Sequence, residues 1–137
     1  MRSLLLHVKE FKVKITGLAT RPAAIEPEPV HKEEEGCDNA IVALICVEEG
    51  DTPEGATNLA AEIKKMMTET GEEQVALVPF AHLSNKLAST SLALSIFKDL
   101  EAEFDSETLI RTHFGSDKEL LLDIIGHPGN ARYREFV

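Results

Sequence analysis

The stretch from Val75 to Leu87, VALVPFAHLSNKL, constrains the fold more than any other part of the sequence. It begins as an apolar run that predicts a strand, and the strand must stop at Pro79 because proline has no N–H to donate to a sheet ladder. A turn follows at residues 80–82, and Ser84 can cap the free amides of a helix that begins there. Such a unit presents backbone N–H groups and one titratable side chain, His82, at a sheet edge, where α/β folds usually bind ligands.

Three further strands are predicted before this stretch. Ser3–Val8 is mainly apolar, and Phe11–Thr16 alternates with the period of two expected of a strand with one wet face. Asn39–Val47 is continuously apolar, which predicts a central strand covered on both faces. Between the second and the third of these strands, Gly17–Glu35 is rich in proline and acidic residues and has no apolar period. We therefore predict a long surface loop there, too acidic to be a good RNA contact.

Two helices are predicted. The first has Thr52 as its cap, Pro53 at its first position and Gly71 at its end, with apolar residues at helical spacing between them. The second begins near Ser84. We expect it to break or to start a second time at residues 89–91, because Ser, Thr and Ser in succession are poor helix formers.

Two strand-like runs, Thr108–Phe114 and Lys118–Ile125, come next in the chain. The residues between them, 115–117, favour a tight turn, so we predict a hairpin. A loop at Gly126–Asn130 then leads into a tail, ARYREFV. This order of strands and helices predicts a mixed α/β domain.

The size and charge of the chain exclude several classes of function. Its 137 residues, 43% of them hydrophobic, are enough to bury the core of one domain. The formal net charge of −10 argues against binding along a nucleic-acid backbone, because such binding needs lysine and arginine to neutralise phosphates. No apolar run approaches the roughly 18 residues that span a bilayer, and the N-terminal segment lacks the cleavage site of a secretory signal. The sequence therefore predicts a cytoplasmic protein with no membrane partner.

Known catalytic motifs are missing from the sequence. It has no phosphate-binding loop, no dinucleotide fingerprint and no nucleophile elbow. His82, His113 and His127 do not have the spacing of metal ligands, and neither Cys37 nor Cys46 belongs to a metal-ligand pair. We therefore expect neither a metal ion nor a cofactor.

What remains is a candidate site made of turn backbone, one or two histidines and Lys118. A nucleophilic pair of Ser84 and His82 has little support, because Ser84 is already explained as a helix cap and no third group accompanies it. Lys118 lies between two acidic residues. It belongs either to the mouth of a site or to a solvated charged turn, and spacing alone favours the turn. The residue pattern thus predicts the edge of a site without naming a reaction.

Several segments together resemble a known family. VPFAHLSNKLA, HFGSDK and IGHPG follow an AIVALICVE strand and an MRSLLLH start, in matching order from Met1 to His127. These segments resemble the N-terminal editing domain of archaeal threonyl-tRNA synthetases, which is similar in fold to D-aminoacyl-tRNA deacylases. The resemblance implies an α/β fold in which mixed β-sheets pack with two main helices. It also implies that residues 1–137 form a single editing domain belonging to a longer chain.

The resemblance implies hydrolysis of L-serine wrongly esterified to threonine tRNA. Lys118 and His82 would be the catalytic residues, with Lys118 and backbone amides holding the serine and the attacking water, His82 serving to position, and the terminal ribose 2′-hydroxyl assisting. The residues implied in substrate binding are Val47, whose backbone would read the adenine, together with Pro79, Phe80, Ala81, Phe114, Gly115 and His127.

The chain departs from the family pattern at several positions. Ser116 and Asp117 stand where relatives carry aromatic residues, and Ala131 stands near the position of an acid. The run of residues 89–91 replaces a proline seen in relatives. The resemblance also implies the partners, which are the 3′ end of threonine tRNA carrying serine, other synthetase domains in cis or in trans, and a second copy in a homodimer. The alternative function is a noncatalytic module of the same fold that contributes binding or dimerisation.

Overall fold

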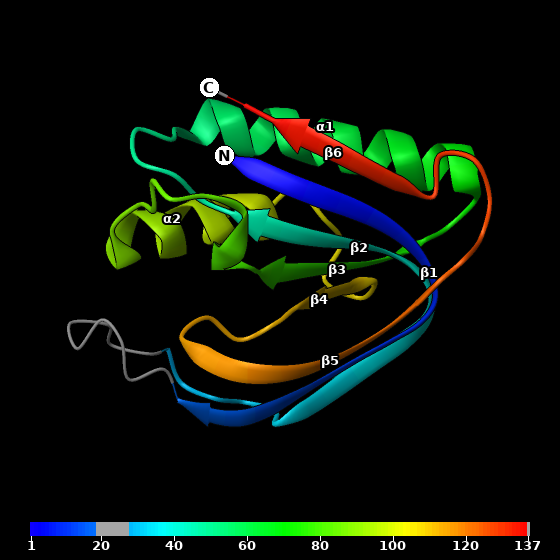
Figure 1. Ribbon diagram of the computed structural model, residues 1–137, viewed down its shortest axis with the longest axis horizontal. Coiled ribbons are helices and arrows are strands. Elements are labelled where there is room, and N and C mark those ends of the chain that lie inside the picture. Colours follow the sequence, from blue (N-terminus) through cyan, green and yellow to red (C-terminus); the bar gives the residue numbers. More distant parts are fainter. Residues whose placement is uncertain (19–27, 137) are drawn as a thin grey trace.

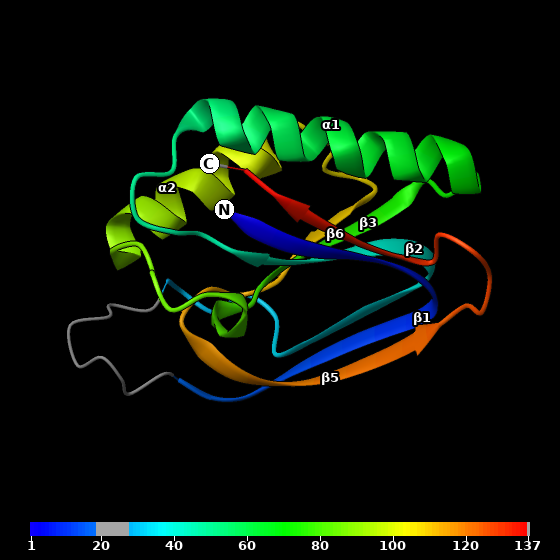
Figure 2. The same ribbon diagram turned by 45° about the horizontal axis from the view of Figure 1, so that its top comes forward.

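The computed structural model describes residues 1–18 and 28–136. Its strands form one six-stranded sheet, and two helices cover one face of that sheet (Figures 1 and 2). The strands follow the order β4-β3-β2-β1-β5, and β6 pairs with β1 beyond the end of β5. Neighbours β2, β3 and β4 are parallel, whereas β1 is antiparallel to each of its partners.

The longest strand is β1 (Arg2–Leu18), where two separate strands were predicted. One edge of β1 pairs with β2 from Arg2 to Lys14. The other edge pairs first with β6 and then with β5, and the register to β5 shifts between Val8 and Glu10. The prediction of two strands was wrong because an irregularity near Lys9 bends the strand without ending it. Figure 1 shows the resulting strong curl of the sheet.

The central strand β2 (Glu34–Cys46) confirms the prediction of a strand buried on both faces. Ile41 and Ile45 face the helices, while Val42 and Leu44 lie in a second apolar cluster on the opposite face. Each such side chain stabilises the fold by about 1.5–3 kcal/mol relative to an exposed one. The predicted loop at Gly17–Glu35 was too long, because β1 and β2 extend into it. Residues 19–27 of that loop lie outside the described residues.

Helix α1 (Pro53–Thr70) forms as predicted and ends at Gly71, whose φ of 76° is left-handed. Thr52 occupies the N-cap position, but its side chain makes no capping hydrogen bond. In the described part of the chain, neither this helix nor any other is long and apolar enough to cross a membrane.

Helix α2 (Thr90–Glu101) begins later than predicted. Its cap is Ser89, whose hydroxyl accepts a hydrogen bond from the backbone N–H of Leu92 at 3.2 Å. The predicted second start at residues 89–91 is therefore confirmed, and the start at Ser84 was wrong. Ser84 instead ends a short 3-10 helix, η1 (Ala81–Leu83), and donates its hydroxyl hydrogen to Glu48 at 2.6 Å.

Strands β4 (Leu109–Arg111) and β5 (Ser116–Ile124) do not form the predicted hairpin. β4 adds to β3 (Gln74–Pro79), and β5 adds to β1, so the two strands stand at opposite ends of the sheet path. The prediction failed because a turn signal reports a change of direction but not the partner of the next strand. The predicted tail was also wrong, because it forms β6 (Ala131–Glu135) on β1.

Candidate functional site

The first wall of the candidate site is the turn at the end of β3. Phe80 is extended and donates its N–H to the carbonyl of Ile45 on β2 at 2.8 Å. η1 then begins at Ala81, and its carbonyl lies 3.8 Å from the buried sulfur of Cys46. The turn is therefore fixed to the end of the central strand, and its backbone is held in one place.

The facing wall is the connection between β4 and β5. Phe114 packs its ring 6.1 Å from that of Phe97 on α2, which ties this wall to the helical core. Gly115 follows with a φ of 92°, a conformation that residues with side chains rarely adopt. The chain then enters β5, where Lys118 pairs with Ile15 of β1.

Between these walls lies a cleft of about 390 Å³. Of the nine predicted site residues, the structure brings seven together in its lining: Pro79, Phe80, Ala81, His82, Phe114, Gly115 and Lys118. Because the two walls come from segments more than thirty positions apart in the numbering, their meeting depends on the curl of the sheet.

Lys118 places an ammonium group in the cleft. Its Nζ donates to the carbonyl of Ser116 at 3.1 Å. Burial lowers the pKa of Lys118 below its ordinary value, although the nearby carboxylates of Asp117 and Glu28 act in the opposite direction. A cation that is partly removed from water interacts strongly with negative charge that develops beside it.

His82 is exposed on η1, and its ring stands nearly perpendicular to that of Phe80 at a centroid distance of 5.0 Å. The ring therefore lies at the mouth of the cleft.

Two predicted site residues lie outside the cleft lining. Val47 is buried, and its carbonyl accepts a hydrogen bond from the N–H of Ala88 at 3.1 Å. His127 lies in the connection between β5 and β6, where its Nε2 is 2.6 Å from Nδ1 of His7. The structure thus separates His127 from the seven residues that it brings together.

Sequence reasoning missed three side chains that hold the second wall: Glu28, Arg111 and His113. The carboxylate of Glu28 accepts hydrogen bonds from the guanidinium of Arg111 and from the N–H of Phe114. His113 bridges the carbonyl of Glu28 and the hydroxyl of Ser116. No local signal marks Glu28, because it lies in an acidic segment whose other carboxylates suit a solvated loop.

A family model described as the archaea-specific editing domain of threonyl-tRNA synthetase matches residues 1–136. The chain belongs to this family of editing domains. The threonine–tRNA ligase of Staphylothermus marinus is 37% identical over 133 residues, covering 93% of this chain and 21% of that protein. The threonine–tRNA ligase of Cenarchaeum symbiosum is 34% identical over 113 residues, covering 76% of this chain and 18% of that protein. The editing domain thus spans about a fifth of the length of these curated relatives.

A solved structure described as c-Myc DNA Unwinding Element Binding Protein superposes with a TM-score of 0.72 at 12% identity, covering 100% of this chain and 99% of that one. At this identity the likeness concerns the fold alone. The editing domain has the mixed α/β, D-aminoacyl-tRNA deacylase-like fold, as expected from the sequence.

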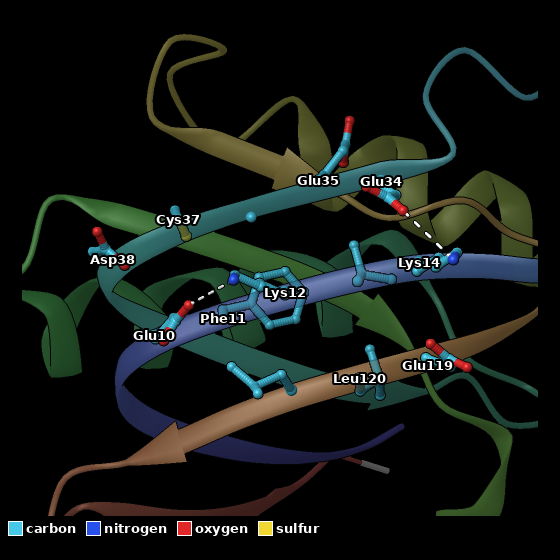
Figure 3. A pocket seen from close by; sticks show the side chains of 13 residues that line it. Glu10, Phe11, Lys12, Lys14, Glu34, Glu35, Cys37, Asp38, Glu119 and Leu120 are labelled. Atoms are coloured by element: carbon cyan, nitrogen blue, oxygen red, sulfur yellow. Dashed lines mark ion pairs between the residues drawn. The ribbon is translucent and has the colours of Figure 1, made fainter.

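The editing domain also has a larger hollow of about 710 Å³ over β1, β2 and β5 (Figure 3). Its two lysines are already paired, Lys12 with Glu10 at 3.1 Å and Lys14 with Glu34 at 3.7 Å. Five carboxylates line it: Glu10, Glu34, Glu35, Asp38 and Glu119. This excess of negative charge in the larger hollow disfavours the binding of anions such as phosphate.

The described residues of the editing domain include no group of three His, Cys, Asp or Glu side chains placed to hold one metal ion. The chemistry available in the cleft consists of backbone amides, one partly buried ammonium, one imidazole, the hydroxyl of Ser116 and the carboxylate of Asp117. Such a set can bind and orient a polar substrate and stabilise an oxyanion.

Proposed function

We propose that the editing domain hydrolyses the ester of L-serine wrongly attached to threonine tRNA. One observation carries this proposal: the Pro79–His82 turn and the Phe114–Lys118 segment, which come from different parts of the chain, face each other across one cleft. Membership of the editing-domain family supports the same function.

Selection of serine over threonine is a matter of size. A synthetic site for threonine cannot strongly refuse serine, because one methyl or methylene group changes binding by only about 1–3 kcal/mol. A second, hydrolytic site that is too small to admit threonine can remove the serine that was wrongly attached. Such a site needs rigid walls. The Pro79 turn is stiff because proline fixes its own φ and the next residue donates to β2.

Hydrolysis adds water across the ester. The water oxygen attacks the seryl carbonyl, the bond to the terminal ribose oxygen breaks, and that oxygen leaves with a proton, giving serine and tRNA. We assign the backbone amides of Ala81 and His82, together with Lys118, to holding the seryl group and the water, with the ribose 2′-hydroxyl assisting. His82 orients the bound end of the RNA. The protein contributes position and electrostatics.

The proposed contact with RNA is small. The terminal adenosine lies at the end of β2, where the backbone of Val47 reads the adenine and Cys46 touches the turn. His127 was assigned to substrate binding, and its contact with His7 leaves that role without support from the cleft. Other domains of a synthetase, in cis or in trans, hold the rest of the tRNA in the cytoplasm, and we propose a homodimer as the assembly.

The experiment compares release of serine and of threonine from threonine tRNA by the 137-residue domain. We expect the domain to release serine and to spare threonine, because the methyl group does not fit. Lys118→Met removes the ammonium and is expected to lose most of the activity, whereas Lys65→Met, an exposed lysine on α1, keeps it.

Two results would contradict the proposal in different ways. Release of both amino acids at the background rate would show a noncatalytic binding or dimerisation module. An unchanged rate in Lys118→Met would show that Lys118 takes no part in the reaction, while the assignment of the fold would stand.

A further inference from the structure

We infer that Glu28 is a positioning residue that fixes the Phe114–Gly115 wall and thereby sets the discrimination between serine and threonine. This inference rests on the proposed function. It assigns a role in the site to Glu28, a residue that the sequence analysis places in an acidic surface loop.

Glu28 contacts the wall at three places. Its carboxylate forms a bidentate ion pair with the guanidinium of Arg111. Nη2 donates to Oε1 at 2.6 Å, and Nη1 donates to Oε2. Oε2 also accepts the N–H of Phe114 at 2.8 Å. The backbone carbonyl of Glu28 lies 2.6 Å from Nε2 of His113. One residue therefore holds both ends of the segment from the last residue of β4 to the aromatic wall.

The contacts continue to the ammonium group in the cleft. A carbonyl can only accept, so Nε2 of His113 carries a hydrogen, and Nδ1 of the same ring makes a hydrogen bond with the hydroxyl of Ser116 at 2.9 Å. The carbonyl of Ser116 in turn accepts a hydrogen bond from Nζ of Lys118 at 3.1 Å. The orientation of Lys118 thus depends on Glu28 through His113 and Ser116.

The ion pair between Arg111 and Glu28, which we call the clamp, is sufficiently shielded from water to hold the wall in a fixed position. The side chains of Arg111 and Glu28 are 12% and 17% exposed. Burial alone would raise the pKa of Glu28, but the hydrogen bonds from Arg111 and Phe114 outweigh it and lower that pKa, so the carboxylate stays charged at neutral pH. Arg111 also contacts Glu101 on α2 at 3.4 Å. That second partner keeps Arg111 from being left fully unpaired when Glu28 is replaced.

The wall has little regular structure of its own. β4 is three residues long, and the chain from Thr112 to Gly115 belongs to neither strand. A displacement of the order of 1 Å at such a wall approaches the extra length of the methyl group that separates the two substrates, and a misplacement of that order can change a rate by about 100-fold. Loss of the clamp should therefore admit threonine more readily and misplace serine.

The test uses Glu28→Gln, which keeps the size of the side chain and removes its charge. The matched control is Glu33→Gln, an exposed glutamate of the same segment whose backbone carbonyl alone accepts from Ile15. Serine and threonine release are measured with kcat and KM resolved, together with amide hydrogen exchange at Phe114. We expect the ratio of serine to threonine release to fall about tenfold in Glu28→Gln, chiefly through kcat. Exchange at Phe114 becomes faster, and Glu33→Gln behaves as the unchanged protein.

A second variant, Arg111→Lys, keeps the positive charge and loses the planar fork. We expect it to fall between the unchanged protein and Glu28→Gln in both measurements, so a failure of Glu28→Gln to fold still leaves a test. An equal fall in both release rates, or slow exchange at Phe114 in both variants, would overturn the inference. Absence of release by the unchanged protein would overturn the proposed function instead, and the exchange at Phe114 would still decide whether Glu28 holds the wall.

Discussion

Lys118 lies in the lining of the cleft, and burying its charged form there costs folding free energy. Burial disfavours its charged form and lowers its pKa, with Asp117 and Glu28 only partly offsetting that effect. Since the pKa in the folded state lies below the ordinary value, folding is penalised while the ammonium is charged. The penalty is present at neutral pH and is relieved as the pH rises through the lowered pKa.

We therefore expect Lys118→Met to be more stable than the unchanged domain at pH 7, by about 0.5–2 kcal/mol, while its serine release is lost. The advantage should shrink as the pH approaches the ordinary pKa of lysine. Urea unfolding at neutral and at alkaline pH checks both statements, with Lys65→Met as the control. A destabilised Lys118→Met would show that the contact with Ser116 outweighs the cost of burial.

At this scale, sequence reasoning placed the residues of the cleft unevenly. The Pro79 turn was predicted from side-chain chemistry, because proline and the apolar run before it leave few alternatives. Lys118 was a candidate from its position in the sequence, but spacing alone favoured a solvated turn, and only the family resemblance favoured a role in the site. The contact of Glu28 with the wall could not be predicted, because it depends on an ion pair with Arg111, and no pattern in the sequence around Glu28 indicates that distant partner.

The elements differ in how firmly their ends are fixed. Helix α2 has a side-chain cap at Ser89, whereas α1 has Thr52 in the cap position without a capping hydrogen bond. Because a cap stabilises through the amide it satisfies, the two positions should respond differently to alanine.

Ser89→Ala is expected to destabilise the domain by about 1 kcal/mol, and Thr52→Ala by only a few tenths. Chemical denaturation of both variants measures the difference. Similar losses in the two variants would mean that the hydroxyl of Ser89 contributes little to the stability of α2. The comparison matters for the site because α2 carries Phe97, against which the wall residue Phe114 packs.

Strand existence was easier to predict than strand pairing. The apolar run of β2 and the alternation in β1 indicate strands by themselves, since burial on one or both faces leaves a direct mark on the sequence. Pairing depends on distant partners. β5 therefore appeared to return on β4, while in the structure it extends the opposite end of the sheet beside β1. β6 was missed because a short edge strand with exposed alternate residues resembles a tail.

The whole molecule carries a net charge of −10, and the lining of the larger hollow in Figure 3 has five carboxylates against two lysines. If the domain acts on tRNA as proposed, this distribution would limit its contact to a few phosphates near the cleft. Counterion release then contributes little to binding, because each released ion corresponds to one phosphate neutralised by the protein.

We expect kcat/KM for serine release by the 137-residue domain to depend weakly on salt. With at most about two phosphates contacted, a plot of its logarithm against the logarithm of salt concentration should have a slope no steeper than about −1.4. Measurements between about 50 and about 200 mM salt suffice. A slope several times steeper would reveal an extended basic contact with the RNA that the charge distribution does not predict.

The connection from Thr112 to Gly115 joins strands from the two ends of the sheet path, and this has a consequence for the order of folding. The parallel strands β2, β3 and β4 can assemble with α1 and α2 as soon as they exist. β1 can pair with β2 at one edge, but its other edge must wait for β5 and β6, since Leu4 pairs with Tyr133 and Lys12 with Leu121. Contacts so distant along the chain form slowly. During synthesis, a chain still short of β5 has most of its core and no closed cleft, so any hydrolytic activity becomes a late marker of complete folding.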